Sequence, residues 1–319
     1  MKRWYPSAAV LAVALVLPWI FRAPYYQHIL ITILIWAVMG TAWNLLGGYA
    51  GQVSFGHAAF FGLGAYTAGI LAAHFNISPW WGMLLGPLVA SLISVPVGLI
   101  CFRLRGPYFA LAMLALGEIF RLVFINWVSL TSGARGIMII PRITAKIPYY
   151  YMALLLLLIA LVTVDLLIKS KCGFYFVSIR EDQDAAESLG VPTTRYKLYA
   201  LLASAFLTGL AGAFYMNYIA FIDPNVVFSL TNVSVMIILV VMLGGVATRW
   251  GPTVGAAIYI VLSELFRTSL GSASVLAFGV LVCLVIMFLP NGLVGELEMV
   301  KKAIQARTNG SEKSGLLRG

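Results

Sequence analysis

Charged side chains are scarce in this chain. Only 10% of its 319 residues are Asp, Glu, Lys or Arg, while 61% are hydrophobic. Soluble globular domains have a charged fraction nearer a quarter, so this composition excludes a soluble domain. Apolar runs of about 20 residues recur without strand-like alternation, and in lipid only helices and closed barrels pair all their backbone groups. The sequence therefore predicts an all-α polytopic membrane protein.

Cysteine and histidine are also rare. The chain has three residues of each type, and they are dispersed: Cys101, Cys172, Cys283, His28, His57 and His74. This spacing indicates neither a disulfide framework nor a metal site. The motif G-x-x-x-x-G-K-[ST] does not occur, which excludes ATP binding through a P-loop in this chain. We expect no bound metal and no cofactor.

The net charge of +10 does not indicate a nucleic-acid partner, because no basic stripe with interleaved aromatic residues accompanies it. In a membrane protein, the distribution of positive residues usually determines the orientation of the spans. The apolar runs predict ten spans, of which the third could instead be re-entrant. They are Ser7–Phe21, His28–Leu46, Gly56–Phe75, Trp80–Phe102, Pro107–Val128, Tyr149–Ile168, Leu198–Ile219, Leu230–Val246, Pro252–Phe266 and Val275–Leu289.

The distribution of Lys and Arg predicts the orientation of these spans. With the N-terminus inside, 15 of the 21 fall in inner segments, 5 in outer segments, and Arg121 lies within a span. This three-to-one bias agrees with the positive-inside rule. We therefore expect both termini in the cytoplasm. Residues 1–295 are expected to form the membrane domain, and 296–319 a charged cytoplasmic tail that is partly disordered.

The segment 169–198 is the one clearly water-soluble stretch between two long apolar runs. Ser178 and Glu181 are spaced as a capping box, in which each side chain pairs an amide of the first helical turn. Gly190 can adopt the left-handed backbone conformation that often ends a helix. Pro192 prevents that helix from continuing or begins the next one. These features predict a short polar helix over Ile179–Leu189. Such a helix at a membrane face is a docking element, or only a charged anchor of topology.

A second unusual stretch, Leu45–Leu71, contains seven glycines that would be poorly tolerated in an ordinary span. They allow close contact between helices in lipid, or they mark a broken helix whose backbone lines a cavity. The polar residues Gln52, Ser54 and His57 favour the cavity, so these three and Gly51 are candidate residues of a substrate path. The pattern L-G-G-x-A in this stretch returns at 243–247, which suggests an internal repeat without establishing one.

Two further candidates for the substrate path, Glu118 and Arg121, are charges expected within the membrane. They are three residues apart and can meet on one helix face. Charges near mid-span face a bundle interior or a water-filled cavity. The pair is a structural ion pair that fixes the helix rotation, or part of a translocation path.

Several stretches together resemble a known family. They are GGYAGQVSFGHAAFFGLGAYTAGIL, RGPYFALAMLALGEIFR, SGARGI, ESLGVPTTRYKLYAL, LGGVATRWGPTVGAA and LPNGLVG, and they extend from about Tyr25 to Gly295. As a set they resemble the permeases of bacterial branched-chain amino-acid ABC importers. The resemblance is closer to the LivM-type subunit than to its LivH-type companion.

The resemblance implies a role for the polar segment. Permeases of ABC importers carry the motif E-A-A-x-x-x-G, in which three residues separate the second Ala from the Gly, and this motif docks into a cleft of the ATPase subunit. Asp184, Ala185, Ala186 and Gly190 match this pattern, with Asp in place of the first Glu, which retains the charge on a shorter side chain. Ala185, Ala186 and Leu189 would give a small apolar face suited to a groove.

The resemblance also implies the partners and the mechanism. It implies a second, LivH-type permease, two ABC ATPase subunits, a periplasmic substrate-binding protein and residence in the bacterial inner membrane. The chain would then be a transport subunit that catalyses no covalent chemistry, working by ATP-driven alternating access. Relatives of this kind also handle urea, short amides or other amino acids. An ATP-independent secondary transporter that uses Glu118 and Arg121 is the alternative from another class, and the D-A-A-x-x-x-G pattern counts against it.

Overall fold

The computed structural model describes residues 5–140, 143–273, 276, 279–280, 283, 287 and 292–296. Within them the chain is almost entirely helical, and one short antiparallel ladder pairs Ile137 with Ile222. The elements are α1 Tyr5–Ile20, α2 Pro24–Trp43, η1 Asn44–Tyr49, α3 His57–Phe75, α4 Pro79–Cys101, α5 Pro107–Asn126, α6 Val128–Thr131, η2 Gly133–Arg135, β1 Ile137–Met138, α7 Lys146–Lys169, α8 Lys171–Glu181, α9 Gln183–Ser188, α10 Thr193–Ile219, β2 Phe221–Ile222, α11 Pro224–Val227, η3 Leu230–Val235, α12 Met236–Gly244, α13 Gly251–Leu270 and η4 Gly271–Ala273.

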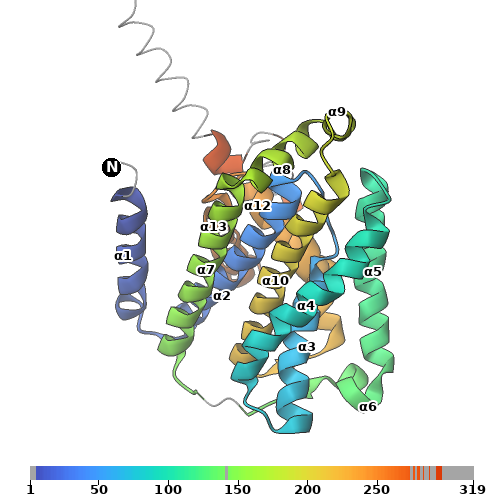
Figure 1. The fold of residues 1–319 in the computed structure, drawn as a ribbon. Coiled ribbons are helices and arrows are strands. Elements are labelled where there is room, and N and C mark those ends of the chain that lie inside the picture. The colour runs from blue at the N-terminus through green and yellow to red at the C-terminus, as the bar shows by residue number, and fades with distance from the viewer. Residues whose placement is uncertain are drawn as a thin grey trace, which may run out of the picture.

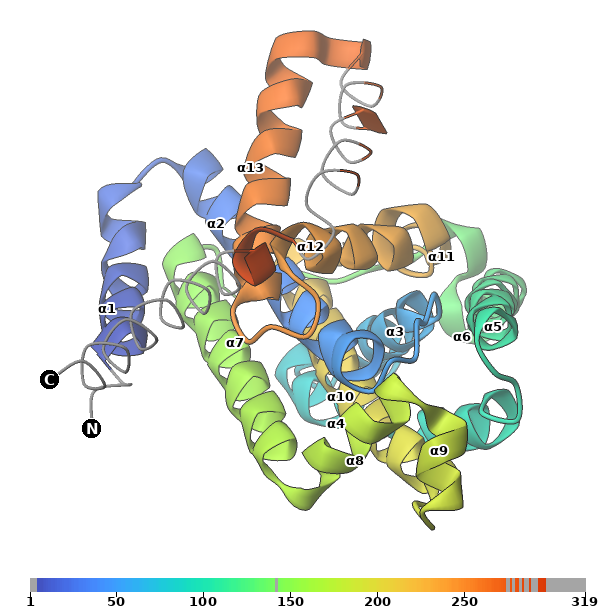
Figure 2. The same cartoon turned by 90° about the horizontal axis from the view of Figure 1, so that it is seen from above.

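The helix α10 lies at the centre of the bundle, where it packs mainly against α3 and α4 and also against α2. The helix α2 in turn packs against α7, α13 and α12. Figure 1 shows α1 and α5 at opposite edges of the bundle, and Figure 2 shows α2, α3 and α10 near its middle. The helices α8 and α9 lie at one end of the bundle, which we call the α9 end.

Small residues set the spacing between α3 and α10. A Cβ atom on Gly64 would lie 2.0 Å from the carbonyl oxygen of Gly209, and one on Gly212 would lie 2.0 Å from that of Phe61. Both distances are shorter than any real contact, so a side chain at either position would force the two helices apart. The structure therefore supports close helix packing for these glycines.

Seven helical segments within the described residues are long and apolar enough to cross a membrane. They are Pro24–Tyr49, His57–Phe75, Pro79–Cys101, Pro107–Asn126, Lys146–Lys169, Thr193–Ile219 and Pro224–Gly244. A polytopic all-α fold is therefore confirmed, and the third predicted span is a continuous helix of 19 residues. The first predicted span falls on α1, whose 16 residues are fewer than the roughly 20 that a hydrocarbon core of about 30 Å requires.

The other two predicted spans fall on α13, which is helical over Gly251–Leu270, and on 275–289, most of which lies outside the described residues. The total of ten spans and the position of both termini in the cytoplasm therefore stay predictions.

The single polar helix predicted over Ile179–Leu189 is wrong. The chain forms two helices, α8 and α9, which are separated by Asp182 in an extended conformation. Ser178 does not cap a helix, because it lies inside α8 and its hydroxyl donates to the carbonyl of Phe174 at 2.8 Å. Instead Asp182 caps α9, and its Oδ1 atom accepts from the backbone amides of Asp184 at 2.9 Å and Ala185 at 3.0 Å.

Candidate functional site

The short helix α9 is held against the bundle by a network of polar side chains. Lys197 on α10 is only 1% exposed, and its ammonium group donates a hydrogen bond to Oε1 of Gln183 on α9. The amide nitrogen of Gln183 donates to Oε1 of Glu187 at 2.8 Å, and the Thr193 hydroxyl donates to the same oxygen at 2.6 Å. Because a buried ammonium is costly unless it is paired, this network ties α9 to the start of α10.

A second connection joins α9 to the turn between α4 and α5. The guanidinium of Arg105 pairs with the carboxylates of both Asp184 and Glu187, the latter at 3.1 Å. The pKa of the Glu187 carboxyl is below its ordinary value, first because Thr193 and then Gln183 donate hydrogen bonds to it, and further because Arg105 is close. Glu187 is therefore ionised at neutral pH and links α9, α10 and this turn.

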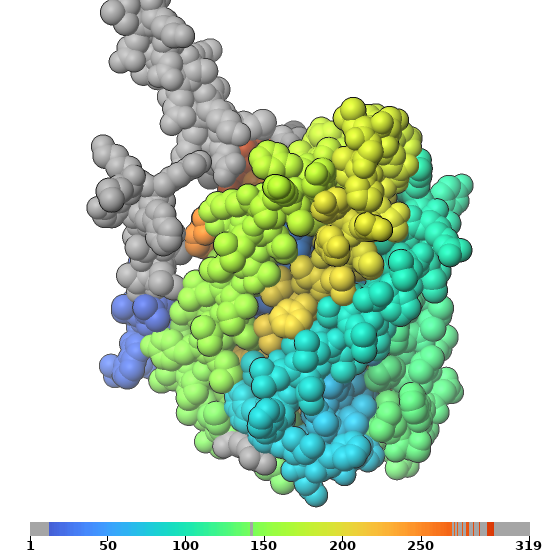
Figure 3. Space-filling model, viewed as in Figure 1, coloured from blue at the N-terminus to red at the C-terminus, as the bar shows by residue number. Residues whose placement is uncertain are grey.

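The outward face of α9 differs from the one expected. Ala186 is only 2% exposed, because it points toward the body of the protein. Ala185 is exposed, and Leu189, which follows α9, is 86% exposed. The exposed apolar pair is therefore Ala185 and Leu189, without Ala186. Gly190 has φ +84°, the left-handed conformation expected from the sequence, and ends the segment. Figure 3 shows this segment at the upper edge of the molecule.

The glycine-rich stretch contains a break in the helix, and this break rests on α8. After η1 ends at Tyr49, residues 50–56 are not helical, and α3 begins at His57. A Cβ atom on Gly51, which has φ +69°, would lie 2.8 Å from Cγ of Arg180. Nη1 of Arg180 also donates to the carbonyl of Gly48 at 3.4 Å. The segment with the candidate path residues thus touches the segment with the coupling motif.

Two of the candidate path residues, Gly51 and Gln52, line a cavity of about 400 Å³ at the α9 end. Gln183 of α9 and the start of α5 complete its wall. Glycine content alone did not indicate this meeting of two segments that are distant in sequence. The structure brings Gly51 and Gln52 to α9, whereas the other candidate path residues lie elsewhere.

Ser54 and His57 are fully buried between helices. The carbonyl of Ser54 accepts from the indole N–H of Trp43 at 2.8 Å, and Nε2 of His57 lies 2.7 Å from the hydroxyl of Ser204. That hydroxyl donates to the carbonyl of Ala42 at 2.6 Å, so Nε2 of His57 must be the donor in their contact. Nδ1 of His57 is then an acceptor, and it has no hydrogen-bond partner among the residues that the structure describes.

The two L-G-G-x-A stretches meet in the structure. Asn44, at the start of η1, accepts from the amide of Ala247 at 2.8 Å and donates to the carbonyl of Thr248 at 2.9 Å. A Cβ atom on Gly48 would lie 2.8 Å from the same amide nitrogen. In each stretch the motif ends one helix and precedes a break and the next helix, which supports the internal repeat that the sequence suggested.

Glu118 and Arg121 form the predicted pair on α5. Nε of Arg121 lies 2.9 Å from Oε2 of Glu118, and Nη1 of Arg121 donates to Oδ1 of Asn225 on α11 at 2.8 Å. The Glu118 side chain is 47% exposed, so the pair lies on the outer face of α5. Within the described residues, no hydrogen bond joins it to Gly51, Gln52, Ser54 or His57.

Removing Arg121 should therefore destabilise the protein more than removing Glu118. Glu118→Gln leaves Arg121 bonded to Asn225, whereas Arg121→Gln leaves a carboxylate with no cation beside it. We expect the thermal midpoint of the solubilised subunit to fall most for Arg121→Gln and least for the double variant. A midpoint of the double variant that fell by the sum of the two single effects would show that the two charges act separately.

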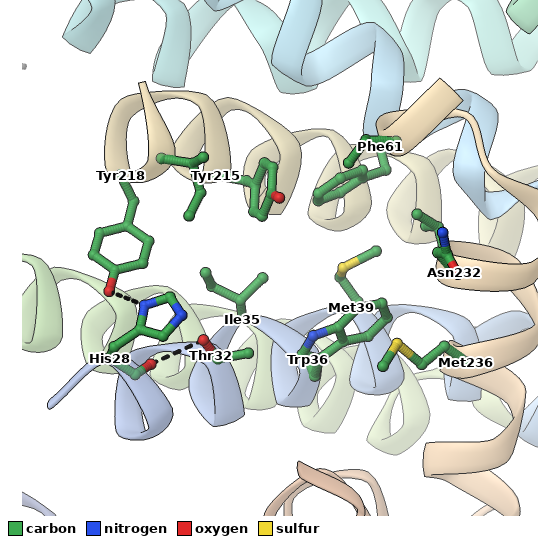
Figure 4. Close-up of a pocket in the computed structure, with 13 residues that line it drawn as sticks. His28, Thr32, Ile35, Trp36, Met39, Phe61, Tyr215, Tyr218, Asn232 and Met236 are labelled. Atoms are coloured by element: carbon green, nitrogen blue, oxygen red, sulfur yellow. Dashed lines mark hydrogen bonds between the residues drawn. The ribbon is translucent and has the colours of Figure 1, made fainter. Parts of the chain in front are cut away.

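No sequence pattern indicated a second cavity of about 310 Å³, which lies beside the half of α2 farther from the α9 end and which we call the outer cavity. Its walls come from α2, α3, α10, α11, η3 and α12, and Figure 4 shows the lining side chains. Nδ1 of His28 lies 2.6 Å from the hydroxyl of Tyr218 across one end. These residues lie on elements far apart in sequence, so no local pattern could have identified them.

A bundle of membrane-length helices that fixes a charged helix at one end defines a polytopic membrane protein. The family described as branched-chain amino acid transport system / permease component matches residues 25–289. The chain belongs to this family, and the family resemblance and transport function predicted from the sequence are therefore confirmed.

Three relatives have the same kind of description. The high-affinity branched-chain amino acid transport system permease protein LivM of Salmonella typhimurium is 28% identical over 82% of this chain and 68% of its own length. LivM of Escherichia coli is 28% identical over 88% of this chain and 71% of its own. A probable LivM of Methanocaldococcus jannaschii is 22% identical over 82% of this chain and 91% of its own. No solved structure matches the chain.

Proposed function

We propose that this chain is the LivM-type permease subunit of an ABC importer that moves branched-chain amino acids across the bacterial inner membrane. It works beside a LivH-type permease, takes substrate from a periplasmic binding protein and relies on two separate ATPase subunits for ATP hydrolysis. The observation that carries the proposal is the attachment of α9. A six-residue helix has little stability alone, yet Asp182, Arg105 and Lys197 all hold it in place.

Through this attachment, a movement of the ATPase subunits is transmitted to the spans. The exposed residues Asp184, Ala185 and Leu189 contact the ATPase subunit, and Gly190 lets the chain reverse direction after them. Through Lys197 a displacement of α9 moves α10, the helix at the centre of the bundle. Alternating access then follows from the shift of α10 against α3 and α4.

The same displacement reaches the candidate substrate path. Arg180 on α8 contacts the helix break at Gly48 and Gly51, so movement of the α8–α9 segment changes the cavity lined by Gly51 and Gln52. We place this cavity at the cytoplasmic mouth of the path. The Glu118–Arg121 pair then holds α5 to α11, because its contacts are with Asn225.

Thiol labelling of a cysteine-free importer tests both orientation and docking. A cysteine at Ser188, which is exposed beside α9, should react only with reagents that reach the cytoplasmic side. Bound ATPase subunits should slow this reaction about tenfold or more by covering the site. A cysteine at Ser129, also exposed and on α6, which lies at the opposite end of the bundle from α9, should react only from outside and at an unchanged rate. Labelling of Ser188→Cys from outside would overturn both proposals, and unchanged labelling on ATPase binding would overturn docking alone.

A further inference from the structure

The cavity on the outer half of α2 combines an apolar wall with neutral polar groups. Figure 4 shows Thr32, His28 and Tyr218 at one end and Asn232 beside Met236 at the other. Between them lie Ile35, Trp36, Met39, Phe61 and Tyr215. Ligand sites are usually apolar and aromatic with a few polar groups that fix orientation, and this cavity of about 310 Å³ has that chemistry.

Its size and lining suit a small amino acid with an aliphatic side chain. Ile35, Met39 and Phe61 offer an apolar surface for a branched side chain. At one end, the Asn232 amide offers an oxygen that can accept from the ammonium and an N–H that can donate to the carboxylate. His28, already bonded to Tyr218, is the one titratable side chain besides the tyrosines among the lining residues. Neutral groups bind a zwitterion weakly. Weak binding suits a site along a transport path, because such a site has to release the substrate that it binds.

A buried cluster closes the cavity toward the α9 end. On α2, Trp43 lies one helical turn beyond Met39 in that direction, and on α3, His57 lies one turn beyond Phe61. Trp43 bonds to the carbonyl of Ser54, and His57 bonds to Ser204 of α10. These four residues, Trp43, Ser54, His57 and Ser204, are all buried, and we call them the plug.

Along α2, the break and α3, the plug residues Trp43, Ser54 and His57 lie between the residues that line the outer cavity and Gly51 and Gln52, or beside the latter. The hydrogen bonding of the plug is incomplete, since Nδ1 of His57 is buried without a partner in the described part of the chain. An unpaired buried acceptor makes the closed arrangement less stable than a fully paired one would be. A barrier built this way can open without first losing a complete set of hydrogen bonds.

We propose that the outer cavity is the transit site of the transported amino acid within this subunit, and that the plug is the gate between this site and the α9 end. This rests on the proposed function and names the residues that contact the substrate. Ile35, Met39 and Phe61 contact the aliphatic side chain. The shift of α10 driven by α9 separates Ser204 from His57 and opens the gate.

Narrowing the cavity tests the site. Ile35→Phe adds bulk to its wall, and Ile33→Phe makes the same change two residues away on α2, on the side that faces α13. ATP-driven initial uptake of leucine and of valine is measured in proteoliposomes with the complete importer and saturating loaded binding protein. We expect Ile35→Phe to lower the ratio of leucine to valine uptake about tenfold, because one methylene in a tight apolar pocket has that effect. Ile33→Phe should leave the ratio unchanged.

A second variant tests the site with a substitution that is not expected to prevent folding. Ile35→Val removes one methyl group, a change that cores tolerate well, and it should raise the ratio of leucine to valine uptake. A ratio unchanged in both Ile35 variants, or shifted equally by Ile33→Phe, would overturn the transit site. Failure of the wild-type importer to take up either amino acid would instead overturn the proposed function, so the two failures are distinguishable.

Discussion

Replacing Ala186 with tryptophan is expected to reduce ATP-driven leucine uptake by at least about tenfold. Ala186 is almost fully buried between α9 and the body of the protein, so a large side chain has no space there. Overpacking a buried site costs about 1–3 kcal/mol, and lifting α9 off the bundle avoids that cost. The hydrogen bond between Lys197 and Gln183 would then break, and α9 would no longer move with α10.

The matched control for this variant is Phe174→Trp. Phe174 lies on α8 in the same polar segment, but its side chain is exposed, so added bulk meets nothing there. Uptake of the control should equal that of the wild type, and both variants should insert into the membrane normally. Wild-type uptake by Ala186→Trp would show that the position of α9 does not matter for coupling, and the segment would then be only a charged anchor.

Replacing Gly51 with alanine is expected to destabilise the subunit by about 2–4 kcal/mol, from two separate effects. A left-handed conformation costs a residue with a Cβ atom about 1–2 kcal/mol. The new methyl group would also lie 2.8 Å from Cγ of Arg180 and 3.0 Å from its Cα, and relieving that contact costs about 1–2 kcal/mol more. Denaturant unfolding of the solubilised subunit measures the sum.

Gly190→Ala separates the two effects. Gly190 also has a positive φ, but a Cβ atom there would meet nothing within 4 Å. Gly190→Ala should therefore lower the free energy of unfolding only by the part that comes from backbone strain. If Gly51→Ala were no less stable than Gly190→Ala, the contact between the helix break and α8 would contribute nothing to stability.

Seven of the helices were predictable from the sequence, because their apolar runs are long enough to cross a membrane and end at polar, Gly or Pro residues. The left-handed conformation of Gly190 and the pairing of Glu118 with Arg121 follow from equally local rules. The boundary between α8 and α9 was not predicted correctly. Ser178 and Asp182 both fit the pattern of a cap, and the spacing alone did not show that Asp182 accepts two amides while Ser178 stays inside a helix.

The candidate site was less predictable, because its contacts join distant parts of the chain. Polar character singled out Gln52, Ser54 and His57, but it did not reveal that Ser54 and His57 pack inside a helix contact while Gln52 faces a cavity. The buried ammonium of Lys197 was missed because a lysine near the end of an apolar run usually points to water. The outer cavity has no sequence signature at all, since apolar residues on several elements form it.

Reconstituted transport tests the central claim most directly. The chain is placed in proteoliposomes with its LivH-type partner, two ATPase subunits and a leucine-loaded binding protein on the outside. We expect the loaded binding protein to stimulate ATP hydrolysis and leucine to accumulate inside, and both activities should require this chain. Leucine accumulation that persists without the ATPase subunits, or hydrolysis that does not respond to the loaded binding protein, would contradict the account.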